Sequence, residues 1–207
     1  MYRKTWMQVN LDKIERNLIK LKNICQKKVI AVLKADAYGC GDIHVARAVL
    51  EAGAEMIAVS SLDEALVLRN EGYEDKLLIL GATEASDIPV LIKQGISCTA
   101  FSNEWVDSAI QQNCEGLHVH LKMDTGMSRI GFRTIDELHL AFNKLQAANC
   151  DMEGIFTHFC CADSDLELTN LQFAKFKEAV ESFSYSFPWV HCDNSDATAF
   201  FKEDTSN

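Results

Sequence analysis

Short apolar segments alternate along this chain with longer segments in which apolar residues recur at helical spacing. Seven apolar segments stand out: Val29–Leu33, Met56–Ser60, Lys76–Leu80, Ser97–Phe101, Leu117–Met123, Met152–Phe159 and Trp189–Cys192. Because they show little alternation between apolar and polar residues, they are typical of strands buried on both faces, as in a parallel sheet. Strands of this kind with helices between them predict an α/β fold.

The segments between these strands predict helices. Leu11, Ile14, Leu18 and Leu21 recur every three or four residues, which gives residues 11–24 one apolar face. Further helices are expected at residues 44–52, from a cap at Asp63 to before Gly72, and from Asp87 and Pro89 to Gly95. Two more should begin at the capping-box pairs Thr134/Glu137 and Thr169/Gln172. The apolar face of the last one is expected to consist of Phe173, Phe176, Val180 and Phe183, packed in the core.

Strands and helices in this order favour a (β/α)8 barrel of the TIM type over a doubly wound sheet. No G-x-G-x-x-G sequence follows the first strand, so the fingerprint of a dinucleotide-binding fold is missing. An eight-stranded barrel usually needs about 250 residues. This chain has 207, and residues 192–206 predict no strand. We therefore expect residues 1–207 to form one incomplete (β/α)8 barrel with about seven strands.

The charge and the cysteine content argue against several classes of protein. Thirty acidic and twenty basic residues give a net charge of −10, which disfavours binding to nucleic acid or to an anionic membrane. No apolar run approaches the roughly 18 residues that span a bilayer, and no signal peptide is visible. The eight cysteines form no C-x-x-C pair, so we expect reduced thiols in a cytoplasmic protein. No metal site is expected.

Lys34 directly follows the first predicted strand, and the C-terminal ends of barrel strands are where functional residues gather. Burial of a lysine at such a position lowers its pKa and makes the amine a usable nucleophile. The small and flexible residues 35–41 would let a cofactor approach the backbone closely. A solvated surface lysine is the alternative at this position.

Three later clusters also follow predicted strands. Arg129 lies among small residues in a loop, where its guanidinium can grip a carboxylate or a phosphate, although an ordinary loop arginine remains an alternative. His158 lies at a strand end among apolar neighbours, where it is either functional or a buried, satisfied histidine. Asn194 and Ser195 can donate hydrogen bonds to a phosphate or form a simple turn.

Taken together, these clusters resemble the alanine racemase family of fold-type III enzymes that use pyridoxal 5′-phosphate (PLP), across essentially the whole chain. The most specific match is the run from Lys34 to Gly41, Lys-Ala-Asp-Ala-Tyr-Gly-Cys-Gly, which resembles the family's PLP-lysine signature. The family more often has histidine at position 40 and glycine where Ser128 stands, while Asp36 is one of the two residues, asparagine or aspartate, that the family has at position 36. Glycine allows backbone conformations that serine resists.

The resemblance implies roles for residues near the first and fifth strands. Lys34 would bind PLP and act as one of two catalytic bases, and Tyr38 would help to hold the cofactor phosphate. Arg129 would be catalytic and would orient the cofactor ring hydroxyl and the substrate carboxylate. Lys122 matches a position that is carbamylated in many members, where it braces the arginine.

The resemblance implies further roles near the last two strands. His158 would sit beside the cofactor ring as a catalytic and cofactor-binding residue that supports the partner of the pyridine nitrogen. Asn194 and Ser195 would lie at the phosphate. The family's pyridine-nitrogen arginine and its C-terminal β-domain, which supplies the second base across a homodimer, are expected to lie outside this chain.

The function implied is PLP-dependent interconversion of L- and D-alanine, which supplies D-alanine for cell-wall peptidoglycan. Because racemisation needs a proton removed on one face of Cα and returned on the other, we expect the chain alone to lack full activity. Three alternatives stay open: a racemase of another small amino acid such as serine, a non-catalytic single-domain PLP-binding protein, and a truncated structural remnant.

Overall fold

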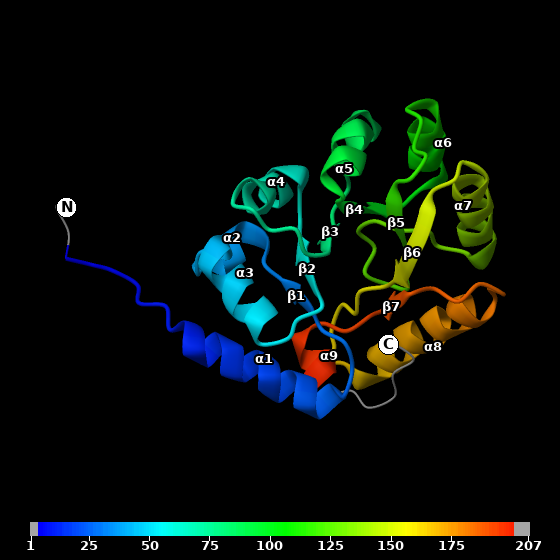
Figure 1. The fold of residues 1–207 in the computed structure, drawn as a ribbon. Helices are drawn as coiled ribbons and strands as arrows, with labels where there is room; N and C mark the ends of the chain where they lie inside the picture. The colour runs from blue at the N-terminus through cyan, green and yellow to red at the C-terminus, as the bar shows by residue number, and fades with distance from the viewer. Residues whose placement is uncertain (1–3, 201–207) are drawn as a thin grey trace.

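A parallel sheet of seven strands forms the centre of the molecule in a computed structural model that describes residues 4–200. The strands are β1 (Ile30–Val32), β2 (Met56–Val59), β3 (Leu77–Ile79), β4 (Ser97–Ala100), β5 (His118–Lys122), β6 (Asp151–Phe156) and β7 (Trp189–His191). Each pairs in parallel with the next one in the sequence, and the sheet curls like part of a barrel wall (Figure 1). The incomplete (β/α)8 barrel is thereby confirmed, since a doubly wound sheet would reverse its strand order.

Helices follow the strands and cover the outer face of the sheet (Figure 1). They are α1 (Leu11–Cys25), α2 (Lys34–Gly39), α3 (Asp42–Glu51), α4 (Leu62–Asn70), α5 (Ile88–Gln94), α6 (Asn103–Gln111), α7 (Ile135–Ala147), α8 (Leu166–Glu181) and α9 (Ser195–Phe200), with a short 3-10 turn, Ala85–Asp87, before α5. After β7 the described chain forms α9, which packs against α1, and no eighth strand occurs up to residue 200. None of the helices within residues 4–200 is long and apolar enough to cross a membrane.

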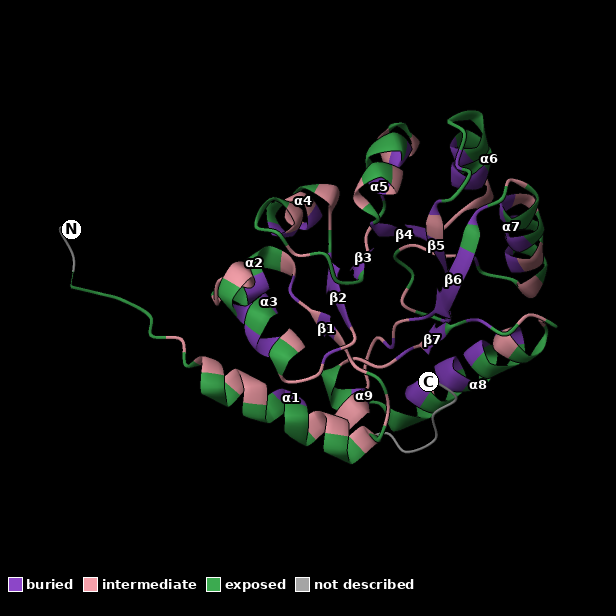
Figure 2. Ribbon diagram, viewed as in Figure 1, coloured by how far each residue is buried: buried purple, intermediate pink, exposed green. Residues whose placement is uncertain are grey.

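The core has two layers because both faces of the sheet are buried (Figure 2). Along β2, Ile57 and Val59 join the large cluster between the sheet and the helices. Met56 and Ala58 instead join a smaller cluster, with Leu78 of β3, on the concave inner face. Alternate side chains of a strand point to opposite faces, so most residues of a strand that is buried on both faces are apolar. This explains why the apolar segments predicted the strands correctly.

Helix capping corrects two expectations from the sequence. Helix α4 is capped by Ser61, whose side chain accepts the N–H of Glu64, so Asp63 lies inside the first turn and is not the cap. Thr134 and Glu137 do form the predicted capping box of α7.

The second predicted capping box, Thr169/Gln172, is wrong because α8 begins earlier. Its cap is Asp165, whose side chain accepts the N–H of Leu168. Thr169 and Gln172 are therefore interior helix residues, and both are fully buried. Helix α6 was not predicted from the sequence; it begins after a capping serine, Ser102, and buries Trp105 in the core.

Candidate functional site

The sequence-predicted site residues lie at one edge of the sheet, because the strands that carry them are parallel. Lys34 follows β1, Lys122 is the last residue of β5, His158 follows β6, and Asn194 follows β7. Arg129 lies in the loop after β5. This is the edge at which barrel enzymes place their active sites.

The turn that follows Lys34 has an unusual backbone. The residues from Ala35 to Tyr38 all have φ between 50° and 57°, the left-handed helical region, although none of them is glycine. Each such residue costs roughly 1–2 kcal/mol, so contacts elsewhere must hold the turn in place. Within it, Leu33 O accepts the N–H of Ala37 at 2.9 Å, and Asp36 O accepts the N–H of Gly41 at 3.0 Å.

Glu64, in the first turn of α4, fixes this turn to the neighbouring strand. Its Oε1 accepts the N–H of Ala35 at 2.7 Å, and its Oε2 accepts the N–H and the hydroxyl of Ser60 at 2.7 and 2.8 Å. Burial alone would raise the pKa of Glu64, but the N–H groups of Ser60 and Ala35 outweigh it and hold the pKa below its ordinary value. Glu64 thus remains a charged acceptor between the ends of β1 and β2.

Glu64 was not among the residues predicted from the sequence, although the sequence contains a signal for it. Ser61 and Glu64 have the spacing of a capping box, S-x-x-E. In the structure only half of that box forms, since the Glu64 carboxylate bonds to Ser60 and Ala35 instead.

Lys34 and Tyr38 face one another across the strained turn. The Lys34 Nζ lies 5.8 Å from the centre of the Tyr38 ring. Tyr38 is 65% exposed, so its phenol does not serve the core and is accessible to a ligand. Lys34 itself is half-buried.

Lys122 is a buried amine beside these groups. It is 2% exposed, and its Nζ lies 5.2 Å from the centre of the Phe156 ring. Burial, followed by repulsion from Arg129, lowers the pKa of Lys122 to about 8, against the opposing attraction of Asp124. Repulsion from Lys34 acts in the same direction. An appreciable part of this amine is therefore neutral and nucleophilic near pH 8.

The loop that carries Arg129 is held by the Asp124 side chain and by a backbone hydrogen bond at its base. Asp124 Oδ1 accepts the N–H of Gly126 at 3.1 Å and of Ser128 at 2.9 Å, and Phe132 donates to Lys122 O at 2.8 Å. Ser128 adopts φ 56°, the conformation for which the family's glycine is suited. Arg129 is exposed, and its guanidinium makes no hydrogen bond or ion pair with any residue from 4 to 200.

His158 is held neutral by its surroundings. Burial, followed by repulsion from Arg129, Lys122 and Lys34, lowers the pKa of His158 to about 4. The pKa shifts of His158 and Lys122 therefore have the same neighbours as causes, which shows that the four groups share one positive environment. Such a site suits an anionic ligand.

Gln172 of α8, misread as a capping residue, links the two loops that carry His158 and Arg129. Its Nε2 donates to Thr125 Oγ1 at 3.2 Å and to His158 O at 3.4 Å, and its Oε1 accepts the N–H of Cys160 at 3.1 Å. Because Gln172 is fully buried, these bonds are shielded from water and fix the relative position of the loops.

Asn194 and Ser195 lie at the same edge with different surroundings. Asn194 Oδ1 accepts the N–H of Ala197 at 3.0 Å, and its Nδ2 donates to Phe159 O at 3.4 Å, so its side chain caps α9 and contacts the residue next to His158. Ser195 opens α9. Instead of the simple turn considered from the sequence, the structure has Asn194 at the start of a helix, and a role at a phosphate stays a prediction for both residues.

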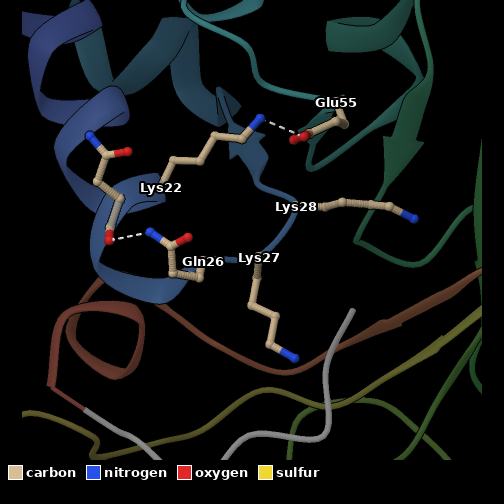
Figure 3. Close-up of a pocket in the computed structure, with 6 residues that line it drawn as sticks. Lys22, Gln26, Lys27, Lys28 and Glu55 are labelled. Atoms are coloured by element: carbon tan, nitrogen blue, oxygen red, sulfur yellow. Dashed lines mark hydrogen bonds and ion pairs between the residues drawn. The ribbon is translucent and has the colours of Figure 1, made fainter.

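Two hollows in the surface lie outside this group of residues. One, of about 560 Å³, lies at the opposite end of the strands, where Lys22 and Glu55 form an ion pair at 2.5 Å near Lys27 and Lys28 (Figure 3). The other, of about 450 Å³, borders the loop between Asp124 and Ser128. The first is too far along the strands to serve Lys34.

No group of three histidine, cysteine, aspartate or glutamate side chains within residues 4–200 is arranged to hold a metal ion.

Comparisons with known proteins agree on one family. The model of the family described as alanine racemase, N-terminal domain, matches residues 9–207. Alanine racemase of Geobacillus stearothermophilus is 38% identical over 212 residues, which covers 100% of this chain and 55% of the relative. Alanine racemase of Streptococcus uberis is 40% identical and covers 99% of this chain and 56% of the relative. The chain thus spans about half the length of the curated relatives it matches.

Solved structures show the same fold. The structure of alanine racemase from Bacillus anthracis with bound L-Ala-P has a TM-score of 0.92 and 36% identity, and the match covers 100% of this chain and 56% of that one. A histidine racemase from Leuconostoc mesenteroides subsp. sake has a TM-score of 0.86 and 26% identity, over 91% of this chain and 52% of that one.

Glu64→Ala should release the turn after Lys34. Because Ala35 N–H loses its charged acceptor, its hydrogen exchange should speed up at least tenfold, and the free energy of unfolding should fall by about 1–3 kcal/mol. Asp63→Ala removes the same charge from the same helical turn and is exposed, so it is the matched control. Equal protection of the Ala35 amide in the two variants, measured by NMR, would contradict the role of Glu64.

His158 should make stability depend on pH between about 4 and 6.5. Its pKa is lowered in the folded state, so the unfolded chain binds more protons in this window and stability falls as pH falls. After allowance for its partial exposure, the effect should be about 1–2 kcal/mol. Urea titrations across this range should show a shallower loss for His158→Gln than for the unchanged chain. Identical pH profiles would show that His158 is not held neutral.

Proposed function

The chain belongs to the alanine racemase family, within which it corresponds to the N-terminal domain, and from this premise we propose that Lys34 binds PLP. The proposed activity of the whole enzyme is the interconversion of L- and D-alanine, because the similar proteins of Geobacillus stearothermophilus and Streptococcus uberis carry the name alanine racemase. The supply of D-alanine for peptidoglycan is the proposed use of the product.

One observation carries this proposal: an accessible lysine at the end of β1 shares a positive environment with Lys122, Arg129 and His158. This donor set fits PLP, because the cofactor offers an aldehyde to an amine and an anionic phosphate to cationic and N–H donors. When bound, PLP withdraws electrons from the Cα of an attached amino acid and makes its proton acidic. The residues around it then determine which proton moves.

The chain's own residues divide the remaining tasks. Lys34 is proposed to hold the cofactor and to take or return the Cα proton on one face. The exposed Arg129, whose donors are not engaged by other described residues, is proposed to orient the substrate carboxylate and the ring hydroxyl. Tyr38, Asn194 and Ser195 are proposed at the phosphate.

Neutral His158 is proposed to support the group that faces the pyridine nitrogen. With a pKa of about 4 it stays uncharged near pH 7, so it can accept a hydrogen bond from a cationic partner. A protonated histidine would instead repel such a partner. The positive surroundings thus help His158 to act as an acceptor, because they lower its pKa.

Racemisation needs a second base on the other face of Cα. Because the matched relatives are nearly twice as long as this chain, we place that base outside the 207 residues, in a homodimer of the whole enzyme. The chain alone is then proposed to bind PLP without completing the reaction. The similar histidine racemase indicates that this fold is compatible with other amino acids, so serine stays a second candidate substrate.

Lys34→Ala should abolish covalent binding of PLP. The chain mixed with PLP should develop the absorbance of a lysine-bound cofactor, and reduction followed by peptide mapping should place the label on Lys34. Lys93→Ala, which alters an exposed lysine of α5, is the control and should keep the absorbance. An undiminished band in Lys34→Ala, or a label on another lysine, would refute the proposal.

Lys122 should react with carbon dioxide. The neutral Nζ forms a bond to the carbon of CO2 and releases a proton to solvent, and the resulting carbamate would pair with Arg129. Since only the neutral amine reacts, carbamate formation should increase as pH rises through about 8. Carbon-13 NMR of the chain under labelled CO2 should show a carbamate signal that Lys122→Met removes. A signal that persists in this variant would assign the modification elsewhere.

A further inference from the structure

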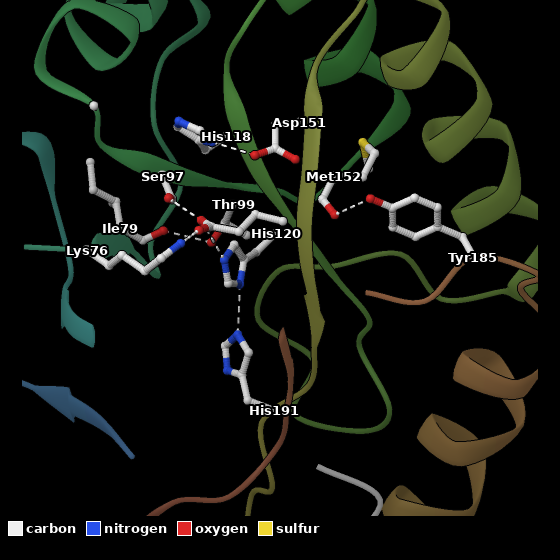
Figure 4. Close-up of polar contacts among 12 residues, drawn as sticks. Lys76, Ile79, Ser97, Thr99, His118, His120, Asp151, Met152, Tyr185 and His191 are labelled. Carbon is white, nitrogen blue, oxygen red and sulfur yellow. Dashed lines mark hydrogen bonds and ion pairs between the residues drawn. The ribbon is translucent and has the colours of Figure 1, made fainter. Parts of the chain in front are cut away.

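A chain of polar side chains runs through the inner face of the sheet (Figure 4). Lys76 forms an ion pair with Glu153 Oε1, and Glu153 Oε2 contacts His120 Nε2 at 3.2 Å. His120 Nδ1 in turn lies 2.9 Å from Nε2 of His191. Ser97 donates its hydroxyl to Glu153 Oε2 at 2.5 Å. His120 is fully buried and Glu153 is 4% exposed.

Two features of β6 make room for this row of polar side chains. The register between β5 and β6 shifts at Glu153: Val119 pairs with Met152, whereas His120 pairs with Gly154. Such a bulge re-aims a side chain, and bulges are frequent beside functional sites. The residue after the bulge must be glycine, because a Cβ on Gly154 would lie 2.4 Å from His120 Nδ1.

The charges determine where the protons sit. Burial raises the pKa of Glu153, but hydrogen bonds from His120, Lys76 and Ser97 outweigh it and hold the pKa well below its ordinary value. An ionised carboxylate only accepts hydrogen bonds, so His120 must carry its proton on Nε2. Lys76 already balances the charge of Glu153.

His120 and His191 are consequently both neutral. Burial lowers the pKa of His120 more than its bond to Glu153 raises it. Burial and the neighbouring His120 and Lys122 lower the pKa of His191. A neutral His120 with a proton on Nε2 has an unprotonated Nδ1, which accepts a hydrogen bond. His191 must therefore donate this hydrogen bond from Nε2–H, and its own Nδ1 is unprotonated.

The unprotonated Nδ1 of His191 lies at the level of the candidate site. His191 pairs with Phe156, which pairs with Lys122, so these three residues occupy one layer at the C-terminal ends of their strands. The His191 ring stacks on Phe156 at 4.6 Å with 5° between the planes. Its Nδ1 makes no hydrogen bond with residues 4–200 and lies on the side of the ring away from His120 (Figure 4).

We propose that Lys76, Glu153 and His120 lock His191 in its Nε2–H tautomer, and that His191 is a positioning residue of the proposed PLP site. The second half of this statement rests on the proposed function. A neutral ring with a bare Nδ1 accepts a hydrogen bond from an N–H or O–H group and does not bind a phosphate. We call these four residues, Lys76, Glu153, His120 and His191, the relay. The relay places a hydrogen-bond acceptor on this side of the site, which suits a group that donates a hydrogen bond. The phosphate is left to other residues.

The first test reads the tautomers directly in the chain without cofactor. In chain labelled with nitrogen-15 histidine, long-range NMR spectra should show Nδ1 of His191 unprotonated. Lys76→Met removes an exposed side chain and leaves the Glu153 charge unbalanced, so His120 should take up a proton. Both of its nitrogens then donate, and His191 should switch to the Nδ1–H tautomer.

Two further variants test whether the unbalanced charge of Glu153 causes the tautomer switch of His191. Lys76→Met combined with Glu153→Gln has no charge to balance but keeps an acceptor oxygen, so the original tautomer of His191 should return. Asp151→Asn is the matched control, because Asp151 is also a β6 carboxylate bonded to a β5 histidine, His118, but lies outside the relay (Figure 4). It should leave His191 unchanged. An unaltered His191 tautomer in Lys76→Met would overturn the relay.

The second test uses PLP as the probe. Lys76→Met should weaken PLP binding several-fold, although Lys76 lies before β3 at the far ends of the strands, and the double variant should restore it. A switched tautomer with unchanged PLP affinity would remove His191 from the site. Failure of the unaltered chain to bind PLP would refute the proposed function, while the tautomer result would still decide the relay.

Discussion

Four groups that carry or can carry a positive charge share one edge of the sheet, and their burial together with their mutual repulsion sets the protonation of the site. Lys34, Lys122, Arg129 and His158 lie close enough for burial and repulsion to lower the pKa values of Lys122 and His158. The lowered pKa keeps His158 uncharged near neutral pH, whereas Lys122, with a pKa of about 8, loses its proton only as pH rises above neutral, so the site stays positive and suits an anionic ligand. The parallel strands produce this concentration of charge, because their C-terminal ends all meet at the same edge.

Such a site requires a rigid frame, and the frame is built from acidic and amide side chains outside it. Glu64 fixes the left-handed turn after Lys34, Asp124 holds the loop of Arg129, and buried Gln172 connects that loop to the backbone of His158. Their hydrogen bonds go mainly to backbone groups of these segments and to the Ser60 and Thr125 hydroxyls, and none of them is made to a lysine, arginine or histidine side chain of the site. Positions are therefore fixed while the positive charge of the site is kept.

The strands and most candidate residues could be predicted from sequence because their signals are local. Buried apolar segments marked the seven strands, and Lys34 stood directly after the first. The supporting residues could not be predicted in the same way. The capping-box spacing is correct at Thr134 but wrong at Thr169, where Gln172 bonds to loops that are distant in sequence. The bulge at Glu153 depends on a histidine of another strand and leaves no local pattern.

Lys34 is proposed to hold PLP at the C-terminal edge of the sheet. The most direct measurement is a crystal structure of the chain grown with PLP. If Lys34 binds the cofactor, the density should be continuous with the Lys34 side chain, with the phosphate near Tyr38 and the ring between Arg129 and His158. Density attached to another lysine, such as those around the hollow near Lys22, would contradict it.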